Sequence, residues 1–196
     1  MSEQINIEAL YRAIDAVNAR DPKPLVWNGA SVPRSLLQGE RATMWLPKVT
    51  DAPSTALSIA ARAHHLARWT IARSSYPDGR AGYLRWRKAS KAASAQLLAE
   101  TLAPLDVATE VISRAVDLVQ RIGLGTDPEA QAAEDVACLV FLETDYAALL
   151  ERLGGETTAT AVRKTLKKMS PTAIGLGVDA TPIGPTRDLL LEVAGS

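Results

Sequence analysis

The chain has 196 residues, of which 47% are hydrophobic, and equal numbers of acidic and basic residues leave it with no net charge. This length predicts one domain whose core is stable without staples. A single cysteine, Cys138, excludes an internal disulfide and a cysteine-rich zinc site. No apolar run approaches the roughly 20 residues that cross a bilayer, and the amino terminus lacks a signal-peptide pattern, so we expect a cytoplasmic protein that does not enter membranes.

The spacing of apolar residues predicts helices along almost the whole chain. The expected helices cover residues 5–19, 33–46, 51–69, 80–102, 106–122, 126–153 and 157–169, with a short last helix over 187–193. Turns are expected at Asn28-Gly29, within an irregular connection, and at Tyr76-Pro-Asp-Gly79. No alternating strand pattern is visible. The sequence therefore predicts a single all-α domain over residues 1–196, with its core in about 5–170 and with 171–196 wrapping the surface.

The segment 126–153 is expected to be the central helix. A threonine cap at Thr126, an early Pro128 and Glu129 three residues after the cap form a typical helix start. The middle of the segment is apolar on all sides, so other helices should surround it. Cys138 lies in this apolar middle, and we expect a buried, unreactive thiol.

Charge is distributed unevenly along the chain. Residues 62–91 hold eight lysines and arginines against the single acid Asp78, whereas residues 100–156 hold twelve acids against three arginines. One interpretation is that the two halves fold onto each other through ion pairs. The other is that acids of the late half line a pocket beside arginines of the early half, and both can hold together.

The only two histidines, His64 and His65, lie within the basic segment. They follow Leu57 by seven and eight residues, on the apolar face of the helix predicted over 51–69. A histidine in this position is either a hydrogen-bonded core residue or a metal ligand or general base.

Two carboxylates of the central segment, Asp135 and Glu143, are eight residues apart and project from nearly the same side of the helix. A buried carboxylate needs a partner. Either arginines of the basic segment pair with them, or Asp135 belongs to a site. The adjacent Glu134 is expected at the surface or as an assisting group.

Arg80, Tyr83 and Arg87 are three and four residues apart and share one helix face. Arg68 and Arg73 precede them. Several guanidiniums beside a phenol suit a phosphate, sulfate or carboxylate, so these five residues are expected to bind an anionic substrate. The remaining basic residues of this helix are expected to be solvated: Arg85, Lys88 and Lys91.

Several runs of sequence together resemble the domain-of-unknown-function family 4202. These runs are ARAHHLARW (61–69), RSSYP (73–77), RAGYLRWR (80–87), EDVACLVFLE (134–143) and KTLKKMS (164–170). The resemblance spans about residues 7–170. It implies membership of an uncharacterised family and no particular activity.

More distantly, the order of parts is similar to the His-Asp (HD) superfamily of helical metal-dependent phosphohydrolases. In that superfamily a histidine on one helix, a His-Asp pair on the next and an aspartate on a later helix hold one or two metals. Here His64 and His65 stand at the pair, which is His-His, and Asp135 stands at the last aspartate, while Glu40 or Arg41 stands where the first histidine would be. The resemblance implies an HD-like fold and a divalent metal held by His64, His65 and Asp135.

The leading hypothesis from these residues is a metal-dependent hydrolase of a small phosphorylated or nucleotide-like anion. His65 and Asp135 would hold the metal or activate water, Glu134 would assist, and the arginines with Tyr83 would bind the anion. The alternative is a noncatalytic module that binds a nucleotide, another anion or RNA through residues 68–87. A third interpretation is a purely structural partner protein.

Overall fold

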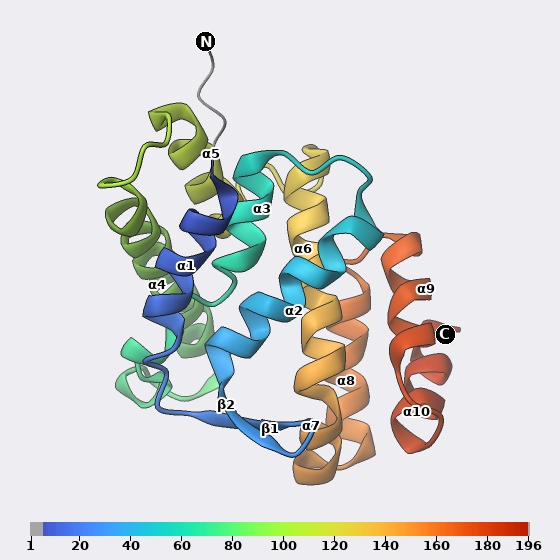
Figure 1. Ribbon diagram of the computed structural model, residues 1–196. Helices are drawn as coiled ribbons and strands as arrows, with labels where there is room; N and C mark the ends of the chain where they lie inside the picture. Colours follow the sequence, from blue (N-terminus) through green and yellow to red (C-terminus); the bar gives the residue numbers. More distant parts are fainter. Residues whose placement is uncertain (1–5, 196) are drawn as a thin grey trace.

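The structure, a computed structural model, describes residues 6–195, where the chain forms ten α-helices, two 3-10 segments and one small hairpin (Figure 1). The helices are α1 (Ile7–Asn18), α2 (Arg34–Val49), α3 (Thr55–Arg62), α4 (Gly79–Leu102), α5 (Thr109–Gln120), α6 (Pro128–Thr144), α7 (Tyr146–Leu153), α8 (Gly155–Leu166), α9 (Pro171–Ala180) and α10 (Pro185–Ala194). The 3-10 segments are η1 (Arg68–Thr70) and η2 (Arg73–Ser75), and the strands are β1 (Pro24–Trp27) and β2 (Ala30–Pro33). The all-α fold class is therefore confirmed. Ile5, where the sequence predicts the first helix to begin, lies outside the described residues.

Helix α6 lies in the middle of the fold. In Figure 1 α2 crosses in front of it, the green helices α4 and α5 lie to one side, and the red helices α9 and α10 lie to the other. Helix α2 packs against both α6 and α3, and α5 packs against α3 and α4. Ten of the 17 residues of α6 are buried, including Cys138, and burial raises the pKa of that thiol to about 12. The buried, unreactive cysteine matches the prediction.

The ends of α6 differ from the prediction at both sides. Its cap is Asp127 rather than Thr126, and the Asp127 carboxylate accepts hydrogen bonds from the backbone N–H groups of Glu129 (2.9 Å) and Ala130 (3.4 Å). A carboxylate at this position also interacts well with the helix dipole. The helix ends at Thr144, so the predicted helix over 126–153 is two helices that meet at Asp145.

The connection after α1 contains strands that the sequence analysis does not predict. Strands β1 and β2 pair antiparallel around Asn28 and Gly29, which have φ values of 49° and 79°. Asn-Gly is the dipeptide favoured in two-residue hairpins because both positions need left-handed backbone. The predicted turn at Asn28-Gly29 is confirmed. The prediction that the residues around it are irregular is wrong, because they form a hairpin.

The C-terminal segment is also more regular than predicted. Instead of a surface wrap with one short helix, it forms α9 and α10, which pack against α6 and α8 respectively. Ala173, Leu190 and Val193 are buried there, so the core extends beyond residue 170. The start of α9 is a Ser170 cap followed by Pro171, a signal readable in the sequence. None of the helices within residues 6–195 is long and apolar enough to span a bilayer.

Candidate functional site

An irregular connection between α3 and α4 carries both histidines. Helix α3 ends at Arg62 instead of continuing to Trp69, and His65 and Ala67 adopt left-handed φ values of 61° and 49°. Such values are strained for residues other than glycine. Helix α4 holds the connection in place, because the Ser94 hydroxyl donates to the Leu66 carbonyl at 2.6 Å.

An open surface cavity of about 400 Å³ lies between α4, the end of α5, α6 and the turn before α9. We call it the basic cavity. Five cationic side chains line it, and they are Arg87, Lys88, Lys91, Arg121 and Lys168. Its one lining acid is Glu134, and Leu84, Leu124 and Gln120 complete its wall. A cationic excess in a concave site suits an anion.

Helix α4 supplies three of these cations because Arg87, Lys88 and Lys91 recur at helical spacing on one face. Arg121 comes from the end of α5, where it has a left-handed φ of 64°. Its Nη1 donates to the Leu118 carbonyl at 2.6 Å and its Nε donates to Glu134 at 2.9 Å. Arg121, the residue that follows α5, therefore holds its guanidinium along the cavity wall.

The cations of the basic cavity change each other's ionisation. Burial, and then repulsion by Arg121 and Arg87, lowers the pKa of Lys91 to about 8. Burial raises the pKa of Glu134, but attraction to Arg121 and Lys168 outweighs it, so the pKa is lowered overall. Glu134 is 5% exposed and stays ionised between these two cations. An anion in the cavity would relieve the repulsion among the cations.

The charged residues of the basic cavity also act on His64. Its pKa is lowered to about 3, first by burial and then by repulsion from Arg121 and Arg68, with Glu134 opposing. The pKa of His65 is also well below its usual value, through burial, then His64 and Arg68. Both rings are therefore neutral near pH 7.

His65 has hydrogen-bond partners at both ring nitrogens. Arg68 donates to Nε2, so the proton lies on Nδ1 and is donated to Gln38 Oε1 at 3.1 Å. Gln38 in turn donates to Asp145 at 2.7 Å. This chain of bonds is the arrangement of a satisfied structural histidine, one of the two interpretations of the sequence.

The predicted anion-binding residues do not all reach the basic cavity. Arg87 lines it, whereas the Arg68 guanidinium lies over the Trp86 ring, 4.6 Å from its centroid. Arg73 donates to the Tyr76 carbonyl at 2.9 Å, within its own turn. The remaining two predicted residues are exposed on α4: Arg80 and Tyr83.

The two adjacent carboxylates of α6 have different surroundings. Glu134 faces the basic cavity, whereas Asp135 accepts hydrogen bonds from the Gln131 side chain (2.9 Å) and the Ser170 backbone N–H (2.8 Å). Asp135 is 2% exposed and ties α6 to the start of α9. No hydrogen bond within residues 6–195 joins it to either histidine. Glu143 pairs with Arg41 of α2 rather than with the basic segment.

Two of the three residues predicted to hold a metal, His65 and Asp135, make other contacts in this arrangement. Across the described part of the chain, no three or more His, Cys, Asp or Glu side chains gather as a metal site. Both nitrogens of His65 are engaged, and Asp135 Oδ1 already accepts two hydrogen bonds. A divalent cation needs these lone pairs free.

Four lining cations are not among the predicted site residues. Lys88 and Lys91 are predicted in solvent; Lys88 is indeed exposed, whereas Lys91 is half-buried. Lys88 follows Leu84 and Lys91 follows Arg87 by four residues each, the signal that could have identified them as one face. Lys168 lies in the KTLKKMS run that carries the family resemblance. Arg121 has no sequence signal, because only its left-handed backbone directs it to the cavity.

Comparison with known families places the chain in one of them. Residues 8–182 match the family described as Domain of unknown function (DUF4202), and the chain belongs to this family. Searches among curated proteins and among solved structures found no match. The family membership confirms the resemblance to family 4202, says nothing of the HD superfamily, and carries no activity with it.

Proposed function

We propose that the protein binds a small phosphorylated, nucleotide-like anion in the basic cavity. The observation that carries this proposal is the charge balance, because five cations and one acid line a space of about 400 Å³. Among the described residues, no ion pair neutralises Arg87, Lys88 or Lys91. A phosphate with about two negative charges would pair with these cations in charge-assisted hydrogen bonds.

The grouping of the cations favours a small ligand over RNA. They come from three places, namely α4, the end of α5 and the turn before α9, and they gather around one open depression instead of forming an extended stripe along the surface. Leu84 and Leu124 add apolar wall at its rim, where a base or another organic group can pack. The ligand class that matches both features is an organic phosphate.

The surroundings favour binding without catalysis. Arg121 and Lys168 hold Glu134 ionised, His64 is a weak base with a pKa of about 3, and Arg68 occupies the acceptor nitrogen of His65. A general base that works near neutral pH needs a higher pKa than that of His64. The alternative from the sequence, a noncatalytic anion-binding module, is therefore the function we propose.

The test is binding of pyrophosphate, AMP and ADP to the purified protein, followed by calorimetry and by the shift in melting temperature. We expect Arg87→Ala to weaken binding about 10- to 100-fold, the effect of one lost charged hydrogen bond. The matched control is Arg85→Ala, because Arg85 is exposed on the same helix and does not line the basic cavity.

Three results contradict the proposal. They are no binding of any of these anions, equal losses in the Arg87→Ala and Arg85→Ala variants, and turnover of the bound phosphate ester without added metal. Salt-sensitive binding of single-stranded RNA that is tighter than binding of the small anions would indicate that the cavity is a nucleic-acid site instead.

A metal-dependent hydrolase of the HD type is the second proposal, and one observation favours it. His64 lies close enough to Glu134, which lines the basic cavity, for the two to interact electrostatically, so an imidazole and a carboxylate lie near the proposed phosphate. Metal analysis after loading with Mn²⁺ tests it. One equivalent of bound Mn²⁺ that is lost in the His64→Ala variant, while the fold stays intact, supports this proposal. The absence of bound metal contradicts it.

A further inference from the structure

A second cavity, of about 290 Å³, lies on the other side of α6. Glu143 lines it and Glu134 lines the basic cavity; these residues are nine apart, or two and a half helical turns, so they project from opposite sides of α6. The walls of the second cavity come from β1, α2, α6, α7 and the region of α9 and α10. We call it the aromatic cavity because Trp27, Trp45 and Tyr146 line it.

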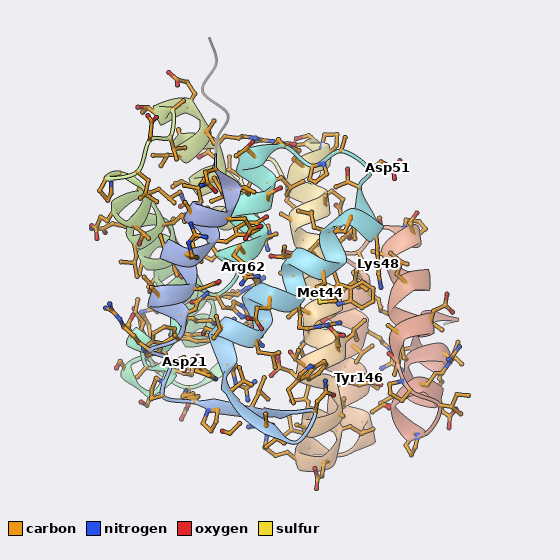
Figure 2. All side chains as sticks on the ribbon, in the orientation of Figure 1. Asp21, Met44, Lys48, Asp51, Arg62 and Tyr146 are labelled. Atoms are coloured by element: carbon orange, nitrogen blue, oxygen red, sulfur yellow. The ribbon has the colours of Figure 1, made fainter. Side chains whose placement is uncertain are left out.

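Two of the three aromatic side chains are held in place by hydrogen bonds. Trp45 Nε1 donates to Glu143 Oε2 at 2.8 Å, and the Tyr146 hydroxyl donates to the Thr186 carbonyl at 2.8 Å. Tyr146, labelled in Figure 2, is fully buried at the start of α7. Anchored rings resist collapse into the space, whereas protein interiors ordinarily leave few voids larger than a water molecule.

Glu143 is the one charged residue among those that line the aromatic cavity, and an arginine pairs with it. Glu143 pairs with Arg41, whose guanidinium carbon lies 5.3 Å from the centroid of the Trp27 ring. Lys48 Nζ lies 4.5 Å from the Trp45 ring centroid. Lys48 is exposed to solvent and does not line the cavity, and the Glu143–Arg41 pair leaves the lining without an unpaired charge. A charged ligand would lose its hydration there without gaining an unpaired partner, so the surroundings favour a neutral ligand.

Glu143, which lines the aromatic cavity, can accept one more hydrogen bond beyond those it makes with described residues. Glu143 Oε2 accepts from both Arg41 and Trp45, whereas Oε1 accepts from Arg41 Nη2 within the described residues. A carboxylate oxygen has two lone pairs, so Oε1 can accept one more donor. A ligand N–H group directed at this oxygen would complete its hydrogen bonding.

The aromatic cavity has an accessible entrance. Ala147, Ala180 and Pro182 line it and are exposed. Exposed apolar residues also adjoin it in sequence, with Val26 before Trp27 at 77% exposure and Ile183 after Pro182 at 90%. A ligand can therefore enter from solvent across an apolar rim.

We propose that the aromatic cavity binds a small, neutral, planar heteroaromatic molecule that bears an N–H group. The ring packs against the indoles and apolar wall, and the N–H donates to Glu143 Oε1. Ligand sites of this size are typically apolar and aromatic with a few polar groups that fix orientation. This site is separate from the basic cavity and does not depend on the function proposed for it.

The probe is indole, titrated into the folded protein and followed by calorimetry and by the ¹H–¹⁵N signals of the tryptophan indoles. We expect saturable binding that shifts the Trp27 and Trp45 signals. N-methylindole, which keeps the ring but lacks the donor, is expected to bind about three- to tenfold more weakly, the effect of one hydrogen bond.

Two exposed alanines of α7 provide the matched variants. Ala147→Leu adds a side chain at the wall of the aromatic cavity and should abolish indole binding. Ala148→Leu makes the same change at the next residue, which is exposed but does not line the cavity, and should leave binding intact. Melting temperatures confirm that both variants fold.

Each remaining outcome overturns the proposal. Absence of indole binding to the unmodified protein removes the site. Equal binding of indole and N-methylindole removes the role of Glu143, and retained binding in Ala147→Leu places the probe elsewhere. Displacement of indole by pyrophosphate would show that the two cavities are not separate sites.

Discussion

Helix α6 and Asp145, the residue that follows it, present acids to two neighbours, and the charge balance differs between them. Toward α2, Asp145 pairs with Arg34 and Glu143 pairs with Arg41, so each acid has one guanidinium. Toward α4 and α5, Glu134 faces a cavity lined by five cations. Matched pairs close the first interface, whereas the excess of cations leaves the second with a positive potential.

This comparison distinguishes charges that stabilise the fold from charges that can bind a ligand. A buried pair contributes little net stability, yet it costs much when one partner is removed. Cations without an acidic partner repel each other in the free protein, and a bound anionic ligand would stabilise them. Changes on the α2 side should therefore affect stability, and changes on the α4 side should affect binding.

The largest expected effect is on the α2 side. Glu143→Ala leaves Arg41 and the Trp45 indole N–H without their acceptor and should lower the free energy of unfolding by about 3 kcal/mol. Urea denaturation measures it, and binding of pyrophosphate should not change. The double variant Arg41→Met with Glu143→Leu should recover about half of the loss, because no unpaired charge remains. A loss equal to that of Glu143→Ala would contradict the pairing argument.

A second change compares the adjacent carboxylates. Asp135→Ala removes the acceptor of the Gln131 and Ser170 donors and should lower the free energy of unfolding by about 2 kcal/mol. Asp135→Asn keeps an acceptor oxygen and should retain most of that stability in urea denaturation. If Asp135→Asn instead abolished anion binding without unfolding the protein, Asp135 would belong to the site after all.

On the α4 side, Glu134→Gln should increase affinity for pyrophosphate about tenfold, because it removes the one lining acid and releases Arg121 and Lys168. Calorimetry at constant ionic strength measures the effect. Higher salt should reduce the difference between the variants. A weaker affinity in Glu134→Gln would mean that Glu134 positions Arg121 for the ligand more than it competes with it.

The smallest expected effect concerns pH. Because the pKa of Lys91 is lowered to about 8, this ammonium loses its charge as the pH rises through that value. Affinity for sulfate, whose charge is constant in this range, should fall about threefold between about pH 7 and pH 9. Lys91→Arg stays charged and should show no fall. A step near pH 6.5 in either protein would instead indicate histidine titration.

Several features of the site are readable from the sequence because they depend on local spacing. The cationic face of α4 follows from residues three and four apart, and it places Arg87 in the correct helix. The position of Glu134 within a buried helix follows from the apolar run around it. The family motifs mark the same segments, since Lys168 and Glu134 both lie within them.

Other features need the folded chain. Neighbouring residues on a helix point about 100° apart, so Glu134 faces the cavity while Asp135 faces α9, and no pattern distinguishes them. The left-handed His65 and Ala67 lie in a run without glycine or proline. Packing of Leu66 and the hydrogen bond from Ser94 impose this backbone against local preference, which ends the predicted helix early.

By itself the sequence determined the all-α class, most helix positions and the segment that concentrates positive charge, because periodicity and caps act within a few residues. Only the tertiary structure decided which charges are matched. Arg41 and Glu143 are 102 residues apart along the chain, and Arg121 reaches Glu134 through one left-handed residue. Pairing over such separations depends on how the helices pack, and that packing leaves α4 with cations that the protein does not neutralise.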